Sequence, residues 1–301
     1  MKIEGRQSGS RVTRSAAGGS VPEQVIEVYD ALAEVYADHY ECGNPDRPFL
    51  NEFLSHLARG ARLLDVGCGT GSGTKYFFDH GMRVKGLDLS GSMIEVARRS
   101  YPYIRFTRKD IRDSNYPAGE LDAIWAGYSL FHMGREDFQT VLKKIRKTLV
   151  PDGIFGLIMQ EGKGDVQFPE PLCPGKSLLV CLYSIKELTE ILSAKGFNVI
   201  ALKRRGPISK LEYPYKKLLL VSQADRGHDI PLATTEQRQR LRRRPSRTAR
   251  QWATAKRQTS RRLCYRVSPM PELYNATPWP GRFSQAEKYL RWSHRHKPYS
   301  Y

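Results

Sequence analysis

The stretch from residue 63 to residue 71 (LLDVGCGTG) has residue types and a spacing suited to holding a nucleotide-like ligand. An apolar run carries an acid, Asp65, near its end, and glycine then occupies every second position from 67 to 71. Glycine lets the backbone turn sharply and leaves no side chain to hold off a ligand. A helix expected to begin near Ser72 would point its free N–H groups and positive dipole end into the same space. The segment therefore predicts a site for the polar, partly anionic end of a nucleotide-like molecule.

The position of the acid argues against a dinucleotide. The fingerprint G-x-G-x-x-G requires glycine at its sixth position, and counting from Gly67 this position is Ser72. A carboxylate at Asp65 suits a ligand that carries an ammonium group and fits badly beside a pyrophosphate. A second apolar run ends at Asp88, whose carboxylate could accept hydrogen bonds from both hydroxyls of a ribose.

The elements that must position these residues follow from the hydrophobic periodicity. Helical stripes are expected at 20–40, 92–97, 138–149 and 184–192, the second opened by a capping box at Ser92 and Glu95. Apolar strands are expected at 61–66, 86–89, 104–107, 121–127, 154–158, 197–200 and 217–221. Strands that alternate with helices predict a mostly parallel sheet covered on both faces, with the ligand at the carboxyl edge of the strands.

At these residues the chain resembles the class I S-adenosylmethionine (SAM)-dependent methyltransferases, over about residues 22–222. The resemblance continues in order through the expected fourth strand to residues 151–158 (PDGIFGLI), which match the family's L-x-P-G-G-x-L element with Asp152 in place of the usual glycine. It implies SAM as the cofactor. It also implies an α/β fold, a three-layer Rossmann-like sandwich with a mostly parallel, seven-stranded sheet and an antiparallel last strand.

Pattern and resemblance together indicate the cofactor site. Asp110 follows the third strand, where the family places an acid beside the adenine amino group. Tyr29 and Tyr36 lie on the first helix, which covers the cofactor as a lid in similar methyltransferases; the alternative is that both rings are ordinary core aromatics. The expected cofactor-binding residues are Tyr29, Tyr36, Asp65, Gly67, Cys68, Gly69, Thr70, Gly71, Asp88, Leu89, Met93, Asp110, Ile111 and Ala126.

The acceptor side carries fewer signals. His132 follows the fourth strand, where it would act either as a general base or as a structural hydrogen-bonding residue. Tyr128 and Phe131 are expected to form the wall of the acceptor pocket, unless they serve packing alone. The run 126–129 (AGYS) differs from the N-P-P-Y type of run that is typical of methyltransferases acting on amino groups of adenine, glutamine or guanine. It also holds no Pro-Cys, so methylation of cytosine C5 would have no nucleophile there. Residues 162–181 are expected to form a variable loop over the acceptor.

Composition predicts three segments: a disordered N-terminal segment 1–19, a methyltransferase domain 20–222 and a basic, disordered extension 223–301. The extension holds 18 Lys and Arg against 5 Asp and Glu, so that +13 of the chain's net charge of +18 lies there. Ile, Leu, Val and Phe make up 8 of its 79 residues, below the roughly one fifth needed for a packed core. Its arginines and aromatics could also contact nucleic acid, and translation in a shifted reading frame is a further alternative.

The remaining sequence features narrow the setting. The five cysteines show no C-x-x-C spacing, so a metal site is not expected. Their odd number and spacing favour a reducing cytoplasm as the location of the protein. No apolar run is long enough to cross a membrane. The oligomeric state cannot be read from the sequence.

The sequence favours a methyltransferase that acts on an oxygen or nitrogen atom of a small-molecule metabolite. Two alternatives stay open. One is an RNA- or protein-modifying methyltransferase with residues 223–301 as a docking arm, and the other is a non-catalytic module that binds SAM.

Overall fold

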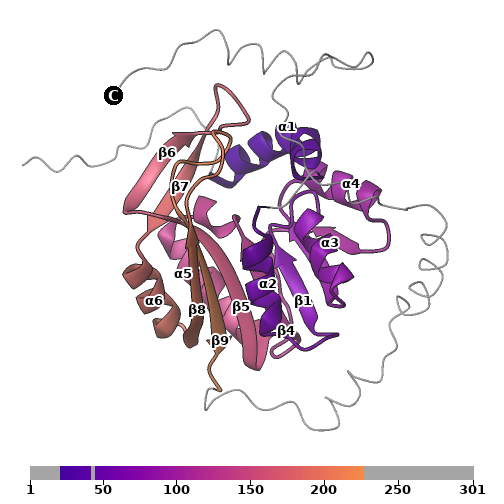
Figure 1. The fold of residues 1–301 in the computed structure, drawn as a ribbon, viewed down its shortest axis with the longest axis vertical. Coiled ribbons are helices and arrows are strands. Elements are labelled where there is room, and N and C mark those ends of the chain that lie inside the picture. Colours follow the sequence, from indigo (N-terminus) through magenta and orange to yellow (C-terminus); the bar gives the residue numbers. More distant parts are fainter. Residues whose placement is uncertain (1–20, 42–44, 227–301) are drawn as a thin grey trace, which may run out of the picture. The chain divides into compact units, whose positions relative to one another are not determined.

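The computed structural model describes residues 21–41 and 45–226, and Figure 1 shows their arrangement. The predictions for residues 1–19 and for most of the extension 223–301 lie outside these residues. The helices are α1 (Val21–Glu41), α2 (Arg47–Ser55), α3 (Ser72–Asp79), α4 (Gly91–Ser100), α5 (Arg135–Thr148) and α6 (Ile185–Ala194), with short 3-10 turns at Ile111–Asp113 and Leu130–His132. The strands are β1 (Arg62–Val66), β2 (Arg83–Asp88), β3 (Arg105–Arg108), β4 (Leu121–Gly127), β5 (Leu149–Glu161), β6 (Gly164–Pro169), β7 (Ser177–Tyr183), β8 (Phe197–Arg205) and β9 (Lys217–Ala224).

The strands form one mixed sheet with the predicted parallel centre. Strands β3, β2, β1, β4 and β5 lie side by side in this order and are all parallel. Strand β9 then pairs antiparallel with β5 and with β8, which confirms the antiparallel last strand. The order reverses between β1 and β4, and a crevice at the carboxyl ends of the strands is expected at such a point.

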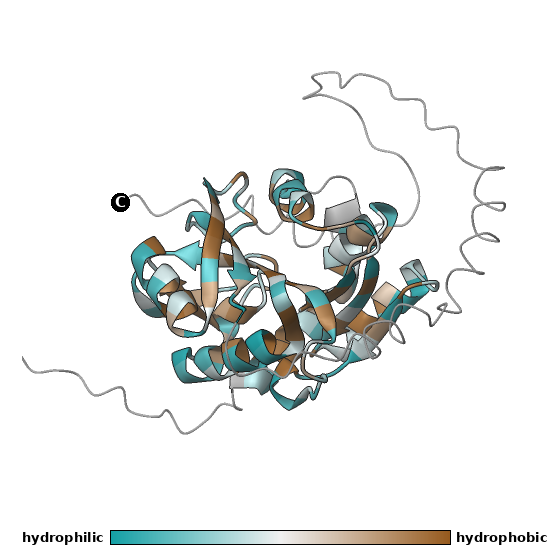
Figure 2. Ribbon diagram, turned by 90° about the horizontal axis from the view of Figure 1, so that it is seen from below, coloured by the Kyte–Doolittle hydropathy of each residue, from teal (hydrophilic) through white to brown (hydrophobic). Residues whose placement is uncertain are grey.

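Helices cover both faces of the sheet, which confirms the three-layer sandwich (Figure 1). Side chains of α5 and α6 pack with Leu64, Ile124 and Phe155 on one face. Side chains of α2, α3 and α4 pack with Leu63 and Ala123 on the other face. The strands therefore carry apolar residues on both sides, and Figure 2 shows them as brown segments in the interior while the helices mix brown and teal.

The sheet has nine strands where seven were predicted. The two additional strands, β6 and β7, come from residues 164–183, which were expected to form a loop. They pair antiparallel along six residues each, and β7 joins the carboxyl end of β5. The continuous apolar run at 178–183 accounts for this difference, because Leu178, Val180 and Leu182 are all buried. The prolines of the segment lie at the end of β6 and in the turn that follows, where they break no ladder hydrogen bond.

Two local predictions are corrected. The residue that caps α4 is Ser90, not Ser92, because the Ser90 side chain accepts a hydrogen bond from the backbone N–H of Met93. The N–H of Ser92 instead donates to Asp30 of α1, at 3.0 Å. Strand β8 also continues five residues beyond the predicted end, to Arg205.

Helix α1 lies across the carboxyl edge of the sheet. Val28 and Leu32 pack on Leu178 of β7, and Ala33 packs on Met93 of α4. The helix thus bridges two elements that are distant in the sequence, and it covers the end of the sheet where a ligand is expected. Within the described residues, no helix is long and apolar enough to cross a membrane.

Candidate functional site

A cavity of about 430 Å³ lies at the carboxyl ends of β1, β2 and β4. Helix α1 contributes Tyr29 and Tyr36 to its wall, the turn between β6 and β7 contributes Glu170, and the loop between β8 and β9 contributes residues 211–213. A site of this size, with mostly apolar walls and a few polar groups, is typical of small-molecule and cofactor binding.

The glycine turn forms as predicted, and the structure explains its composition. Gly67, Gly69 and Gly71 have φ angles of +70°, +53° and +87°, in the left-handed region that other residues rarely adopt. A Cβ atom on Gly67 would lie 2.1 Å from the Cβ of Ser129, so this position has no room for a side chain. The N–H groups of Gly67 and Cys68 both donate to the carbonyl of Leu87, which ties the turn to β2. Helix α3 then begins at Ser72, as expected.

Asp65 is a buried acid that lines the cavity. It lies opposite Gly86 of β2 and Trp125 of β4, and 3% of its surface is exposed. The hydroxyl of Thr74 donates to Oδ2 of Asp65 at 2.6 Å. Burial raises the pKa of the Asp65 carboxyl to about 7, because a buried charge lacks solvation by water. The positive charge of a ligand ammonium group would stabilise the Asp65 carboxylate in this buried position.

Asp88 ends β2 and organises the backbone around the glycine turn. Its Oδ2 accepts from the N–H of Gly69 at 2.8 Å, and its Oδ1 accepts from the N–H of Ser90 at 2.9 Å. The backbone of Leu89 also donates to this carboxylate. A carboxylate has about four lone pairs, so Asp88 keeps acceptor capacity for a further donor such as a sugar hydroxyl. Burial raises the pKa of Asp88 despite these hydrogen bonds.

Asp110 also lines the cavity and is bound by Arg112 of the turn that follows β3. The guanidinium Nε and Nη2 donate to Oδ2 at 2.9 and 2.6 Å, and the N–H of Arg112 donates to Oδ1 at 2.7 Å. Against a desolvation that would raise it, these bonds hold the pKa of Asp110 below its usual range. Its Oδ1 keeps a lone pair for an amino group.

Comparison with known proteins also indicates a methyltransferase. Residues 63–153 match the model of a methyltransferase domain family. A dTDP-3-amino-3,6-dideoxy-alpha-D-glucopyranose N,N-dimethyltransferase of Streptomyces fradiae is 27% identical over 226 residues, covering 72% of this chain and 81% of that protein. O-methyltransferase rstn1 of Aspergillus nomiae is 28% identical over 170 residues, covering 50% of this chain and 70% of that protein.

A solved structure agrees with these matches. The 1,6-didemethyltoxoflavin-N1-methyltransferase of Burkholderia thailandensis, with bound 1,6-didemethyltoxoflavin and S-adenosylhomocysteine, has a TM-score of 0.56 and 22% identity. The match covers 70% of this chain and 93% of that chain. The chain is a SAM-dependent methyltransferase. SAM is therefore its methyl donor.

The residues of the methyltransferase fit this cofactor. Asp65 offers a buried carboxylate for an ammonium group, and Asp88 keeps acceptor capacity for a hydroxyl. Gly69 lines the cavity, and a Cβ there would meet nothing closer than the Met93 sulfur at 4.0 Å, so its missing side chain leaves open space.

The cavity brings together most of the predicted site residues. Two of the predicted set do not line it. The Ala126 side chain is fully buried in the core beneath α5, and Gly71 packs against Phe106 and Tyr101 at the start of α3. Those that line it are Tyr29, Tyr36, Asp65, Gly67, Cys68, Gly69, Thr70, Asp88, Leu89, Met93, Asp110, Ile111, Tyr128, Phe131 and His132.

Replacement of Asp88 by alanine is expected to weaken S-adenosylhomocysteine binding by about 1.5–3 kcal/mol, which is the contribution of hydrogen bonds to a charged group. Calorimetric titration measures this change. Asp113→Ala is the control, because Asp113 stands in the neighbouring loop and does not line the cavity. Equal affinity of the Asp88 variant and the native protein would show that Asp88 does not bind the ribose.

His132 is held between two elements that lie far apart in the sequence. Its Nδ1 lies 2.8 Å from the carbonyl oxygen of Leu179, an acceptor, so Nδ1 carries the proton. Its Nε2 lies 2.8 Å from the hydroxyl of Tyr29, which therefore donates to it. Burial lowers the pKa of His132 to about 4, so the ring is neutral at physiological pH. This arrangement favours the hydrogen-bonding role over that of general base.

Loss of the Tyr29 hydroxyl is expected to loosen α1. Tyr29→Phe leaves the buried Nε2 of His132 without a donor, at a cost of about 1–3 kcal/mol. We expect faster hydrogen exchange at the amides of α1 and up to about tenfold weaker S-adenosylhomocysteine binding. Tyr76→Phe, which removes an exposed hydrogen bond to Asn51 outside the cavity, should change neither. Unchanged α1 exchange in Tyr29→Phe would contradict this role of the bond.

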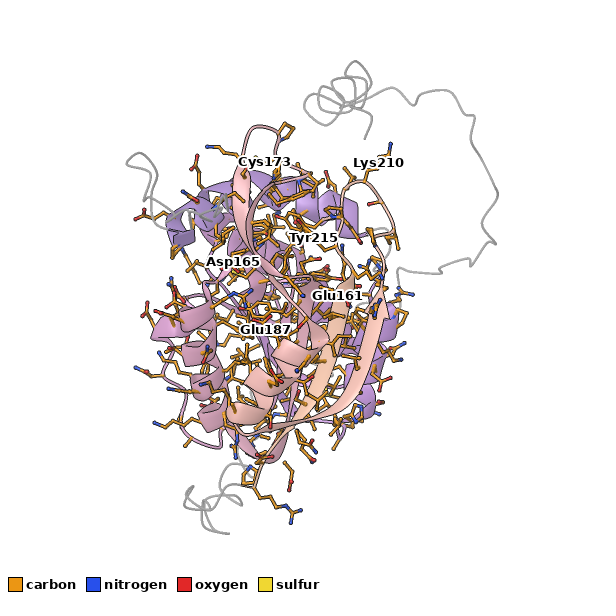
Figure 3. The ribbon with its side chains drawn as sticks, turned by 90° about the vertical axis from the view of Figure 1, so that its left-hand side faces the viewer. Glu161, Asp165, Cys173, Glu187, Lys210 and Tyr215 are labelled. Atoms are coloured by element: carbon orange, nitrogen blue, oxygen red, sulfur yellow. The ribbon has the colours of Figure 1, made fainter. Side chains whose placement is uncertain are left out.

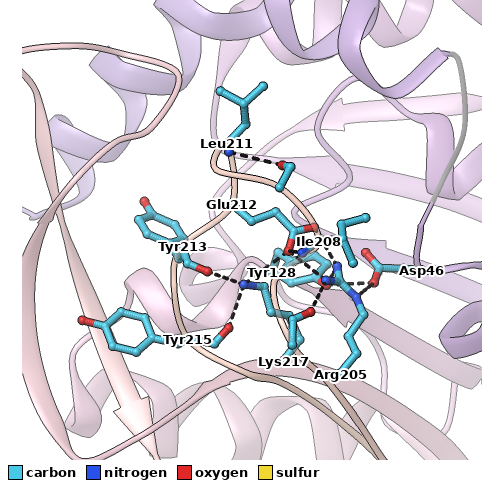
Figure 4. Close-up of polar contacts among 11 residues, drawn as sticks. Asp46, Tyr128, Arg205, Ile208, Leu211, Glu212, Tyr213, Tyr215 and Lys217 are labelled. Carbon is cyan, nitrogen blue, oxygen red and sulfur yellow. Dashed lines mark hydrogen bonds and ion pairs between the residues drawn. The ribbon is translucent and has the colours of Figure 1, made fainter. Parts of the chain in front are cut away.

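A charged cluster that was missed in the sequence forms another part of the wall (Figure 4). The Arg205 guanidinium donates to Asp46 Oδ1 at 2.8 Å, to both oxygens of Glu212 at 2.8 and 3.0 Å, and to the Tyr128 hydroxyl at 2.9 Å. Tyr128 itself donates to Asp46 Oδ1 at 2.9 Å. The cluster fixes the Tyr128 ring, whose backbone has a left-handed φ of +60°.

Lys217 completes this cluster from β9. Its Nζ donates to the backbone carbonyls of Tyr213 and Tyr215 and lies 3.4 Å from Glu212. The loop between β8 and β9 is thus tied to the sheet at both ends. No local signal marks these residues, except that β8 ends in a basic run (KRR).

Proposed function

We propose that this methyltransferase transfers a methyl group to an oxygen or nitrogen atom of a small-molecule acceptor. The observation that carries the proposal is a group of contacting aromatic rings in the cavity wall, those of Tyr128, Phe131 and Tyr213. Aromatic walls suit a compact organic molecule. The names of the relatives support this class, since one describes an amino sugar nucleotide and another a didemethyltoxoflavin.

The residues contribute to the reaction by binding and orienting. SAM supplies a methyl group already activated on a sulfonium. We propose that Asp65, Asp88 and Asp110 hold the cofactor through its ammonium, its ribose and its adenine. Tyr128, fixed by Asp46 and Arg205, would position the acceptor. Orientation of the two reactants accounts for most of the rate in such a transfer.

The proposal is tested by release of S-adenosylhomocysteine from SAM when the full chain is incubated with separate pools of amines, phenols and carboxylic acids. We expect release that depends on one small-molecule pool. Release with RNA or protein pools alone would favour a macromolecular substrate instead. Binding of S-adenosylhomocysteine without release in any pool would favour a non-catalytic module.

A further inference from the structure

Glu170 is a buried acid in the cavity wall that has no role in the cofactor site. It follows β6, in the turn of the β6–β7 hairpin, and 3% of its surface is exposed. Its Oε2 accepts from the Tyr213 hydroxyl at 2.6 Å, and its Oε1 lies 3.4 Å from the N–H of Leu172. Both donors are neutral, so they offset the burial of a negative charge only in part.

No cation among the described residues pairs with this carboxylate. Lys176 of the same turn forms its ion pair with Glu27 of α1, at 2.6 Å. Lys217 and Arg205 are bound to Glu212 on the other side of the β8–β9 loop. Burial raises the pKa of Glu170, which reflects the cost of an uncompensated charge. Figure 3 shows this end of the molecule, with Cys173 in the hairpin turn and Lys210 in the neighbouring loop.

Gln160, at the end of β5, is a second polar group without compensation. It lines the same cavity and 1% of its surface is exposed. Its Oε1 is buried and has no hydrogen-bond partner among the described residues. Buried polar atoms are almost always hydrogen-bonded, and Gln160 belongs to the cavity wall, so its unpaired oxygen is available to a donor on a ligand.

We propose that the acceptor of this methyltransferase carries a protonated amine, bound by the carboxylate of Glu170 and the amide oxygen of Gln160. This inference rests on the proposed function. Glu170 supplies the charge and an acceptor for the N–H group, and Gln160 supplies a further acceptor. The rings of Tyr213 and Phe131, whose centres lie 5.9 Å apart, belong to the same wall and favour a cation by their negative faces. Tyr213 acts as a positioning residue, because its hydroxyl orients the carboxylate.

The test compares two probes of equal shape, cyclohexylamine and cyclohexanol, bound to the full chain saturated with S-adenosylhomocysteine. Titration followed by ligand-observed NMR gives both affinities. We expect the amine to bind about tenfold tighter or more, which is the usual effect of a charge-assisted hydrogen bond. Equal affinities, tighter binding of the alcohol, or no saturable binding of the amine would overturn the proposal.

Matched variants separate recognition from structure. Glu170→Gln keeps an acceptor for the Tyr213 hydroxyl but removes the charge, so the amine preference should fall to within about twofold while S-adenosylhomocysteine binds as before. Glu27→Gln makes the same change on the exposed face of α1 and should keep the preference. Gln160→Met should weaken amine binding severalfold and gives a second reading if the Glu170 variant does not fold. A preference that survives in Glu170→Gln would overturn the proposal.

The outcome is distinct from that of the proposed function. Probe binding needs no turnover, and the acceptor pools test turnover without reference to Glu170. Methyl transfer to acceptors that lack an amine would overturn the amine inference and leave small-molecule methylation standing. An amine preference without methyl transfer in any pool would overturn the proposed function alone.

Discussion

Replacement of Asp65 by asparagine is expected to weaken S-adenosylhomocysteine binding by about 30- to 1,000-fold, or about 2–4 kcal/mol. The substitution keeps an acceptor for the Thr74 hydroxyl but removes the charge that an ammonium group requires. Breaking a buried ion pair on one side is costly because the other charge stays uncompensated. Isothermal calorimetry of the native and variant proteins measures the change.

The same variant should lose a pH dependence that the native protein has. Since the pKa of Asp65 is about 7 without ligand, its carboxyl is mostly protonated below that pH. An ammonium ligand requires the ionised carboxylate. Below pH 7 its binding must therefore also remove the proton of Asp65, which costs about 1.4 kcal/mol of binding free energy for each pH unit below the pKa. Native affinity should therefore rise about tenfold per pH unit towards pH 7 and then level off. The asparagine variant should show a flat profile.

The contribution of Asp65 to the stability of the fold should depend on pH in the opposite direction to the ligand affinity. It should become less favourable as the pH rises towards 7. Asp65 binds its proton more tightly in the folded chain than in the unfolded chain, because burial raises its pKa. Its burial therefore costs nothing below about pH 4, and the cost grows until it is complete above about pH 7. Asp65→Asn should raise the Tm at pH 8 and leave it nearly unchanged at pH 4. Asp79→Asn, at an exposed site on α3, is the control, and a loss of Tm at pH 8 confined to Asp65→Asn would contradict this account.

Replacement of Gly67 by alanine is expected to lower the free energy of unfolding by about 2–5 kcal/mol. About 1–2 kcal/mol of this is the cost of a left-handed backbone at a residue with a Cβ. A further cost of about 1–3 kcal/mol comes from overpacking, because the new Cβ would lie 2.1 Å from that of Ser129. Urea unfolding measures the total, and S-adenosylhomocysteine binding should fall with it because the turn must move.

The chain offers a matched control for this substitution. Gly60 has a similar φ of +83°, but a Cβ there would meet nothing within 4 Å. Gly60→Ala should therefore lose only the backbone contribution, about 1–2 kcal/mol. Removing the opposing Cβ, in the double variant Gly67→Ala with Ser129→Gly, should recover part of the loss. Equal losses in Gly60→Ala and Gly67→Ala would show that close packing against Ser129 contributes nothing.

The presence of the three acids and the glycine turn in one cavity was predictable because its signals are local. Each acid lies within two residues of the carboxyl end of its strand, and the glycine turn is continuous in the sequence. Parallel strands bring their carboxyl ends to one edge, so Asp65, Asp88 and Asp110 had to lie near one another once the strands were assigned. The error at the start of α4 was also local, since Ser90 and Ser92 both satisfy the rules for a capping residue.

The acceptor side was not predictable in this way. Glu170, Gln160, Arg205 and Tyr213 come from a hairpin turn, the end of β5, the end of β8 and a loop, and no spacing links them. The hairpin itself was taken for a loop, because its prolines and glycines outweighed the short apolar run of β7. One signal was present: Gln160 is a polar residue that follows the apolar run at 154–159.

The sequence by itself determined the parallel sheet, the glycine turn and the chemistry of the cofactor, since each depends on residues close together in the chain and on the order of strands. The tertiary structure alone decided which polar and charged side chains are buried, and which of these have a hydrogen-bond partner or an opposite charge beside them. Leu179 of β7 sets the proton position on His132, and neutral donors leave Glu170 without a cation. These properties depend on contacts between residues 40 or more positions apart, and burial of a charge is settled only when those contacts form.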